Sequence, residues 1–165
     1  MYFLTVCAAR RASSFGRVTG GRMIENRCAG IVRHCWSSLP DHYPHVSLDA
    51  FVVMPDHVHA IVVLRNTRPV AVCGDDVVRA GFKPAPTGGD ALAGAGSVRH
   101  GLPEVVRAFK TFSARRINAV RATPGTAVWQ RGYYERIIRD ERALKNIREY
   151  IRSNPHNHPP KHPNP

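Results

Sequence analysis

The segment from residue 46 to residue 64 constrains the fold of this chain most strongly. Two apolar runs, residues 46–53 and 57–64, are rich in valine, isoleucine and leucine and flank the short segment Met54-Pro55-Asp56. β-Branched side chains favour strands, and so short a break leaves room only for a tight turn. The sequence therefore predicts that both runs are strands and that they pair as an antiparallel hairpin.

The second strand of this hairpin begins with the tripeptide His57-Val58-His59. Side chains alternate between the two faces of a strand, so both imidazoles project from one face and Val58 projects into a core on the other. Two imidazoles at this spacing can reach one divalent ion. They can also be ordinary histidines at the start of a strand, so the spacing alone leaves both interpretations open.

The region before the hairpin predicts one strand and one helix. Residues 2–8 form an apolar run that predicts a first strand, and residues 10–21 predict a basic loop. Apolar residues then recur at three-to-four spacing from Met23 to Leu39, which predicts an amphipathic helix ending near Pro40.

The region after the hairpin predicts two helices and two short strands. A helix is predicted over residues 102–120, followed by strands at 127–130 and 133–138. A last helix should begin after an Asp140 N-cap and end by Ser153, because the next residue precedes a proline. This order of elements fits an α+β, ferredoxin-like (RRM-like) sandwich with an antiparallel sheet.

Two stretches fall outside this pattern. Residues 65–101 hold seven glycines, three prolines and few large apolar side chains, which predicts a flexible insertion; a short ordered element around residues 77–82 is the alternative. Residues 156–165 are rich in proline and histidine, cannot build a core and are predicted to be an extended tail. The sequence thus predicts a single domain over residues 1–155.

The charge balance predicts a polyanionic partner. Lysine and arginine number 24 against 12 acidic residues, giving a formal net charge of +12. This excess favours nucleic acid, with a generally basic solvated surface as the alternative. The candidate DNA-binding side chains are Arg107, Lys110, Arg115 and Arg116 of the second predicted helix, which could instead form a solvated face, and Arg131.

The four cysteines, at positions 7, 28, 35 and 73, contain no CxxC pair. They predict reduced thiols in a cytoplasmic protein rather than a zinc knuckle or a disulfide framework. The chain has no run of about 18 apolar residues and no recognisable signal peptide, so we expect no membrane span.

Three blocks of the sequence together resemble a known family. They are Met54-Pro55-Asp56-His57-Val58-His59, then Trp-Gln-Arg-Gly-Tyr-Tyr at 129–134, then Tyr150-Ile-Arg-Ser-Asn154-Pro155. In this order they resemble the single-tyrosine HUH transposases, especially the REP-associated tyrosine transposases; HUH denotes histidine, bulky hydrophobic residue, histidine. The likeness runs over residues 2–155 with a gap in the middle. It also implies the ferredoxin-like fold, with the histidine pair on a central antiparallel strand.

The resemblance assigns roles to four positions. His57 and His59 match the metal-binding histidines of the family, and Tyr150 matches the nucleophilic tyrosine on its C-terminal helix. Asn154 matches the polar residue that supplies a third metal ligand one helical turn later. Nitrogen and amide-oxygen ligands suit Mg²⁺ or Mn²⁺.

The resemblance also implies an activity, which is the metal-dependent cutting and rejoining of single-stranded DNA through a 5′-phosphotyrosine intermediate. The DNA would carry a hairpin or palindromic element. Two alternatives stay open: a non-catalytic nucleic-acid-binding ferredoxin-like module, and a metal-dependent nuclease that uses water. We expect Tyr133 and Tyr134 of the second block to pack rather than to attack DNA.

The assembly is not decided by the sequence. The family includes dimers in which the tyrosine helix of one subunit completes the site of the other, and monomers closer to the REP-associated group. Because the motifs resemble that group most, we expect a monomer, with a homodimer as the alternative. A bacterial-type, nucleoid-associated location in the cytoplasm would accompany this function.

Overall fold

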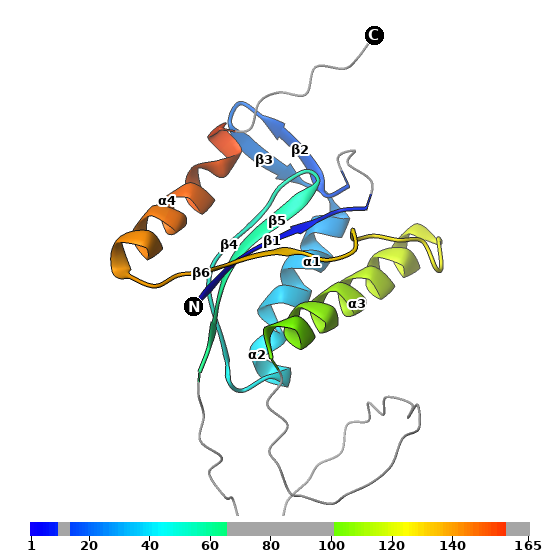
Figure 1. Ribbon diagram of the computed structural model, residues 1–165. Helices are drawn as coiled ribbons and strands as arrows, with labels where there is room; N and C mark the ends of the chain where they lie inside the picture. The colour runs from blue at the N-terminus through cyan, green and yellow to red at the C-terminus, as the bar shows by residue number, and fades with distance from the viewer. Residues whose placement is uncertain (10–13, 66–100, 158–165) are drawn as a thin grey trace, which may run out of the picture. The chain divides into compact units, whose positions relative to one another are not determined.

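The computed structural model describes residues 1–9, 14–65 and 101–157 (Figure 1). Most of the predicted insertion and most of the predicted tail, residues 66–100 and 158–165, lie outside the described residues.

A four-stranded antiparallel sheet forms the centre of the fold, in the order β4-β5-β1-β6. Its strands are β1 (Tyr2–Cys7), β4 (Val46–Val53), β5 (His57–Leu64) and β6 (Tyr134–Ile137). The predicted hairpin is confirmed, because β4 and β5 pair directly. Residues 127–130 do not form the predicted strand; Trp129 makes an isolated bridge to Ala8, the residue after β1.

Helices cover both faces of this sheet (Figure 1). On one face lie α1 (Arg27–Ser37) and α3 (Leu102–Arg121), with the short α2 (Leu39–His42) after α1. On the other lies α4 (Glu141–Asn157). We call these the closed face and the site face. The element order, strand–helix–strand–strand–helix–strand, and the central position of β1 and β5 confirm the ferredoxin-like fold.

The closed face holds the larger core. Leu4 and Val58, on the central strands, are each 1% exposed and pack with the side chains of α1 and α3. Trp129 closes one end, where its ring packs against Phe109 and its indole N–H donates to the Ser113 hydroxyl at 2.9 Å. The burial of these apolar surfaces is the main source of stability for a domain of this kind.

The predicted start of the first helix is wrong. Residues 16–25 instead form a second hairpin, from β2 (Gly16–Thr19) and β3 (Arg22–Glu25). Gly20 and Gly21 have φ angles of +57° and +72°, which a two-residue hairpin turn favours and which glycine adopts at little cost. The helix begins only at Arg27, where the Asn26 side chain accepts hydrogen bonds from the first free backbone N–H groups.

The predicted end of the last helix is also wrong, whereas its start is confirmed. The Asp140 carboxylate caps α4 by accepting from the Ala143 N–H at 2.7 Å. The helix continues through Pro155 to Asn157. So close to the helix end, the missing proline N–H removes only one backbone hydrogen bond. The last turn also has a neighbour, since the His156 ring lies where a Cβ on Gly21 would stand.

Among the described helices, none has the length and apolar character needed to cross a membrane.

Candidate functional site

The two histidines lie on the site face at the start of β5. Their Nε2 atoms are 3.1 Å apart and their ring centroids 4.5 Å apart. Val58 between them is buried in the closed-face core, as the strand alternation predicts. Both imidazoles therefore present the same nitrogen to one point in space.

Each imidazole is held through its other nitrogen, Nδ1. The Asp56 carboxylate lies 2.8 Å from Nδ1 of His57, and the Thr5 hydroxyl lies 2.9 Å from Nδ1 of His59. An ionised carboxylate can only accept, so the Nδ1 of His57 carries a proton and donates it to Asp56, while its Nε2 faces the Nε2 of His59. A hydroxyl can donate or accept, so the Thr5 contact is compatible with either tautomer of His59.

His59 is the more buried of the pair. It is 6% exposed, and its ring stacks on Phe3 with centroids 5.4 Å apart. Burial first, and the neighbouring His57 second, lower the pKa of His59 to about 3. The imidazole is therefore neutral at physiological pH, which is the form that binds a metal ion.

The predicted nucleophile meets this pair in the same chain. Tyr150 projects from α4, and its hydroxyl oxygen lies 3.4 Å from Nε2 of His59. Its ring makes T-shaped contacts with the rings of Phe3 and His59, at centroid distances of 6.2 Å and 5.2 Å. The residue is 48% exposed, so these contacts orient the ring and still leave it accessible to a large substrate.

Asn154 lies one helical turn after Tyr150 on α4 and is 7% exposed. Within the described chain, no hydrogen bond joins its side chain to either imidazole. The structure thus places Asn154 on the helix that carries Tyr150, as predicted from the four-residue spacing. Its role as a ligand stays a prediction.

Two sets of contacts fix α4 over the sheet. Leu144 and Ile151 of the helix pack with Ile61 of β5 in a small second core. Arg148 binds the Asp49 carboxylate of β4 with two hydrogen bonds, of 3.0 Å from Nε and 2.6 Å from Nη2. The bond from Arg148 is the main cause that lowers the pKa of Asp49. These contacts set the position of Tyr150 relative to the histidines.

The donor atoms fit a small divalent ion. Two ligands at right angles on an ion with bonds of about 2.1 Å lie about 3 Å apart, which matches the spacing of the two Nε2 atoms. Across residues 1–9, 14–65 and 101–157, no three histidine, cysteine, aspartate or glutamate side chains form a metal-binding group. A third protein ligand would therefore have to be of another type, such as the amide oxygen of Asn154.

The adjacent tyrosines of the second motif have different surroundings. Tyr133 packs against the closed-face core, and burial together with Glu135 raises its pKa to about 12. Tyr134 lies on β6 and is 59% exposed. Tyr133 therefore packs as expected, whereas Tyr134 does not.

The predicted DNA-binding residues do not form one surface. Arg107 faces Glu104, and Arg116 donates to the Cys35 sulfur of α1 at 3.8 Å. On an ideal helix these two arginines point about 180° apart. Lys110 instead donates to the backbone carbonyls of Gln130 and Gly132, at 2.7 and 2.9 Å, and so holds the loop before β6 that carries the exposed Arg131.

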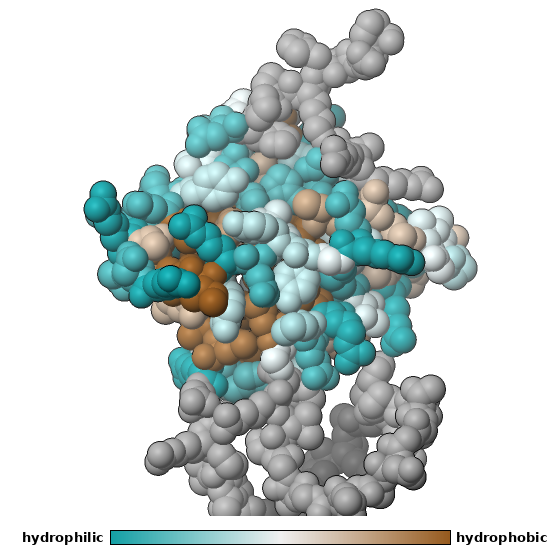
Figure 2. Space-filling view, viewed as in Figure 1, coloured by the Kyte–Doolittle hydropathy of each residue, from teal (hydrophilic) through white to brown (hydrophobic). Residues whose placement is uncertain are grey.

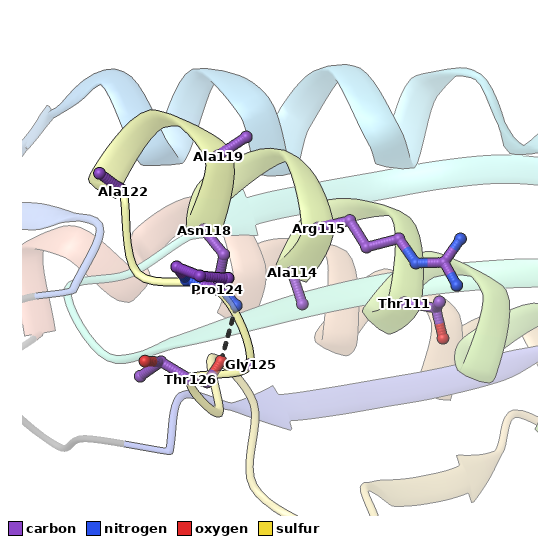
Figure 3. A pocket seen from close by; sticks show the side chains of 9 residues that line it. All are labelled: Thr111, Ala114, Arg115, Asn118, Ala119, Ala122, Pro124, Gly125 and Thr126. Carbon is purple, nitrogen blue, oxygen red and sulfur yellow. Dashed lines mark hydrogen bonds between the residues drawn. The ribbon is translucent and has the colours of Figure 1, made fainter.

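Arg115, the remaining basic candidate, lines a pocket of about 510 Å³ at the C-terminal end of α3 (Figure 3). Asn118 closes one side by donating to the Thr126 carbonyl at 2.8 Å. Arg115 is the only charged residue among those that line the pocket. The pocket shares no residue with the histidine pair, so we assign it no part in the chemistry.

Sequence reasoning missed two residues that orient the histidines. The sequence predicts a turn at Asp56, and its position next to His57 is the signal for its further role. Thr5 carries no signal of its own, because its role depends on the pairing of β1 with β5, which places it opposite His59.

Comparison with known proteins gives a relative and a fold. No family model matches the chain. An uncharacterised protein of Haemophilus influenzae is 32% identical over 163 residues, covering 93% of this chain and 79% of that protein. The solved structure of a REP-associated tyrosine transposase bound to a REP hairpin matches with a TM-score of 0.53 and 20% identity. That match covers 93% of this chain, which spans only 65% of that transposase. The fold implied by the sequence motifs is thereby confirmed.

Proposed function

Since the chain belongs to the same family as the Haemophilus influenzae protein and has the fold of a REP-associated tyrosine transposase, we propose that it is a single-tyrosine HUH transposase. It would cut single-stranded DNA and rejoin it. One observation carries this proposal. The Tyr150 hydroxyl lies 3.4 Å from Nε2 of His59, a buried neutral imidazole, and this nitrogen also faces Nε2 of His57. A module that only binds nucleic acid has no need of that arrangement.

His57, His59 and Asn154 would hold the divalent ion, Mg²⁺ or Mn²⁺. When bound, the ion would polarise the scissile phosphate and stabilise the negative charge that develops on it. Asp56 and Thr5 would keep the two rings oriented, because residues that bind the second nitrogen of a ligating histidine fix its tautomer and its direction.

Tyr150 would act as the nucleophile. Its oxygen forms a bond to phosphorus and loses the phenol proton, while the bond from phosphorus to the 3′ oxygen breaks and that oxygen gains a proton as a hydroxyl. The 5′ phosphate remains on the tyrosine as a phosphodiester. Attack by another 3′ hydroxyl reverses the step and joins two strands without ATP.

The substrate we propose is single-stranded DNA beside a hairpin. The similar transposase of known structure is bound to a REP hairpin. A net charge of +12 supplies the electrostatic attraction for phosphates. A tyrosine that is half exposed on a folded domain can reach a backbone phosphate only where the strand is unstacked and accessible.

The site we propose is complete within one subunit. Tyr150 approaches His59 of its own chain, and Arg148 of the same helix pairs with Asp49 of the same chain. Mixing Tyr150→Phe protein with His57→Ala protein tests this arrangement. A cis site gives no cleavage on mixing, whereas restored cleavage would show that subunits exchange α4.

The central experiment asks whether DNA becomes attached to the protein. Hairpin-bearing oligonucleotides with randomised single-stranded flanks and a label at the 3′ end are incubated with Mg²⁺, Mn²⁺ or EDTA. We expect a labelled protein band that survives denaturation and needs the metal. Cleavage without attachment would identify a nuclease that uses water. Binding without cleavage or attachment would identify a non-catalytic module.

A further inference from the structure

Helix α4 leaves the β6 edge of the site face exposed. The helix packs along β4, the edge strand on one side, through Arg148 and Asp49. At the opposite edge, all four residues of β6 are exposed. The site-face residues of β1 and β6 therefore form a strip that runs from the histidines to the sheet edge. Phe3 packs with the apolar cluster of α4 at the inner end of this strip, and β6 is exposed at its outer end.

The register of the strands places Tyr134 on this strip. Thr5 of β1 is opposite His59 on one side and opposite Tyr134 on the other. Residues that are directly opposite on neighbouring strands project from the same face. His59, Thr5 and Tyr134 thus form one row across the sheet. With strands about 4.8 Å apart, the backbone of Tyr134 lies about 10 Å from that of His59.

Arg136 lies on the same strip, because it is opposite Phe3, whose ring stacks on His59. The side chain at 135, which is acidic, projects to the other face. The strip therefore presents an exposed aromatic ring and a guanidinium, with exposed Arg131 and Arg139 on either side of β6. In Figure 2 one apolar patch lies near the place where Figure 1 shows the N-terminus.

We propose that this strip, made of Thr5, Tyr134 and Arg136, binds the single-stranded DNA that passes through the cleavage site. Tyr134 stacks on a base next to the scissile phosphate, and Arg136 binds a backbone phosphate. Aromatic rings beside cationic side chains are the general means by which proteins bind single strands without reading their sequence. This inference rests on the proposed function, since that function requires the strand to pass the histidine pair.

Binding without metal tests the strip separately from the chemistry. A fluorescein-labelled oligothymidylate is titrated in EDTA, with anisotropy as the readout, against wild type, Tyr134→Ala and Tyr134→Phe. Stacking of one base is worth about 1–3 kcal/mol, so Tyr134→Ala should weaken binding between about 5-fold and about 150-fold. Tyr134→Phe keeps the ring and should stay within about 2-fold of wild type. Tyr133→Phe, on the closed face, is the matched control and should also stay within that range.

The arginine has its own readout. Arg136→Ala should reduce the slope of log affinity against log salt by about 1, the value expected for one lost phosphate contact. Arg142→Ala removes the same charge from the exposed start of α4 and should leave the slope unchanged.

Photocrosslinking locates the contact directly. An oligothymidylate that carries 5-iododeoxyuridine is irradiated with the protein, digested with trypsin and analysed by tandem mass spectrometry. We expect the adduct on the peptide of residues 132–136, at Tyr134 rather than Tyr133.

Two results would overturn the inference. One is a DNA affinity of Tyr134→Ala within 2-fold of wild type, and the other is an equal loss of DNA affinity in Tyr134→Ala and Tyr134→Phe. Neither result bears on the covalent adduct at Tyr150, which is measured with metal. Conversely, the wild-type protein could form no adduct while Tyr134→Ala still weakens DNA binding. That outcome would support the binding strip and contradict the proposed transposase function.

Discussion

The two faces of the sheet differ in what they bury. Among the described residues, the core cluster of the closed face contains 22 buried apolar residues, whereas that of the site face contains 4, two of them on α4 itself. Most of the hydrophobic free energy is therefore gained on the closed face. The site face can in consequence accommodate buried polar groups, such as His59 and Asn154, whose burial costs stability.

The central strands serve both faces through alternation alone. On β5, Val58 and Ala60 belong to the closed face, while His57 and His59 belong to the site face. The two imidazoles thus start from a rigid backbone, which would let the proposed metal site be held with little freedom of movement. Substitutions on alternate residues should separate stability from activity.

The largest expected contrast is between two tyrosines on opposite faces. Tyr150→Phe removes the hydroxyl of the proposed nucleophile and should lower the yield of the covalent DNA adduct by at least about 1000-fold. Tyr133→Phe removes a hydroxyl on the closed face and should leave the yield within a few-fold of wild type. Denaturing gels of the labelled oligonucleotide measure both. An adduct retained by Tyr150→Phe would shift the role to Tyr133 or Tyr134.

The next contrast concerns metal binding. His57→Ala and His59→Ala each remove one of two converging nitrogens, so Mn²⁺ affinity measured by isothermal titration calorimetry should fall by at least about 100-fold. His34→Ala, which removes an exposed imidazole from α1, is the control and should bind Mn²⁺ like wild type. Equal affinity in all three variants would exclude a site built on this pair.

Neighbouring residues of β1 provide a sharper comparison. Leu4→Ala empties part of the closed-face core and should lower the free energy of unfolding by about 2–5 kcal/mol. Thr5→Val removes only the hydroxyl beside His59, so it should cost about 1 kcal/mol. The effect on metal affinity should be reversed, with a loss of about 10- to 100-fold for Thr5→Val and little change for Leu4→Ala.

Urea unfolding and calorimetry measure the two quantities on the same proteins. If Thr5→Val bound Mn²⁺ as tightly as wild type, the hydroxyl would not orient the imidazole.

The elements with strong apolar patterns were predictable from the sequence. β4 and β5 match the predicted residues 46–53 and 57–64, because alternation or burial marks nearly every position. The β2–β3 hairpin was missed because its strands have only four residues each and are largely exposed, which leaves no core-facing pattern. The turn glycines Gly20 and Gly21 and the helix cap Asn26 are the signals in the sequence that the helix begins only after residue 26.

The site was predictable only where one element contains the pattern. The histidine pair and the Tyr150–Asn154 spacing each lie within a single strand or helix. The contact of Thr5 with His59 and the strip of Thr5, Tyr134 and Arg136 depend on the pairing of β1 with β5 and β6. This pairing joins residues more than fifty positions apart. The sequence does not encode such register locally, so these contacts could come only from the fold.

The smallest expected effect concerns the ion pair that holds α4. Asp49→Asn removes a charge-assisted pair that is partly exposed, so it should lower the free energy of unfolding by about 1 kcal/mol at pH 7. The pKa of Asp49 is lowered from its ordinary value of 3.8, mainly by Arg148. A carboxyl whose folded pKa is lowered contributes stability above its ordinary pKa and loses it as pH falls through the folded value. The difference between wild type and Asp49→Asn should therefore vanish in strong acid.

Asp140→Asn is the control, because asparagine also caps a helix. Urea unfolding followed by tryptophan fluorescence measures each variant, and a difference that persisted unchanged in acid would show that the pair is not its source.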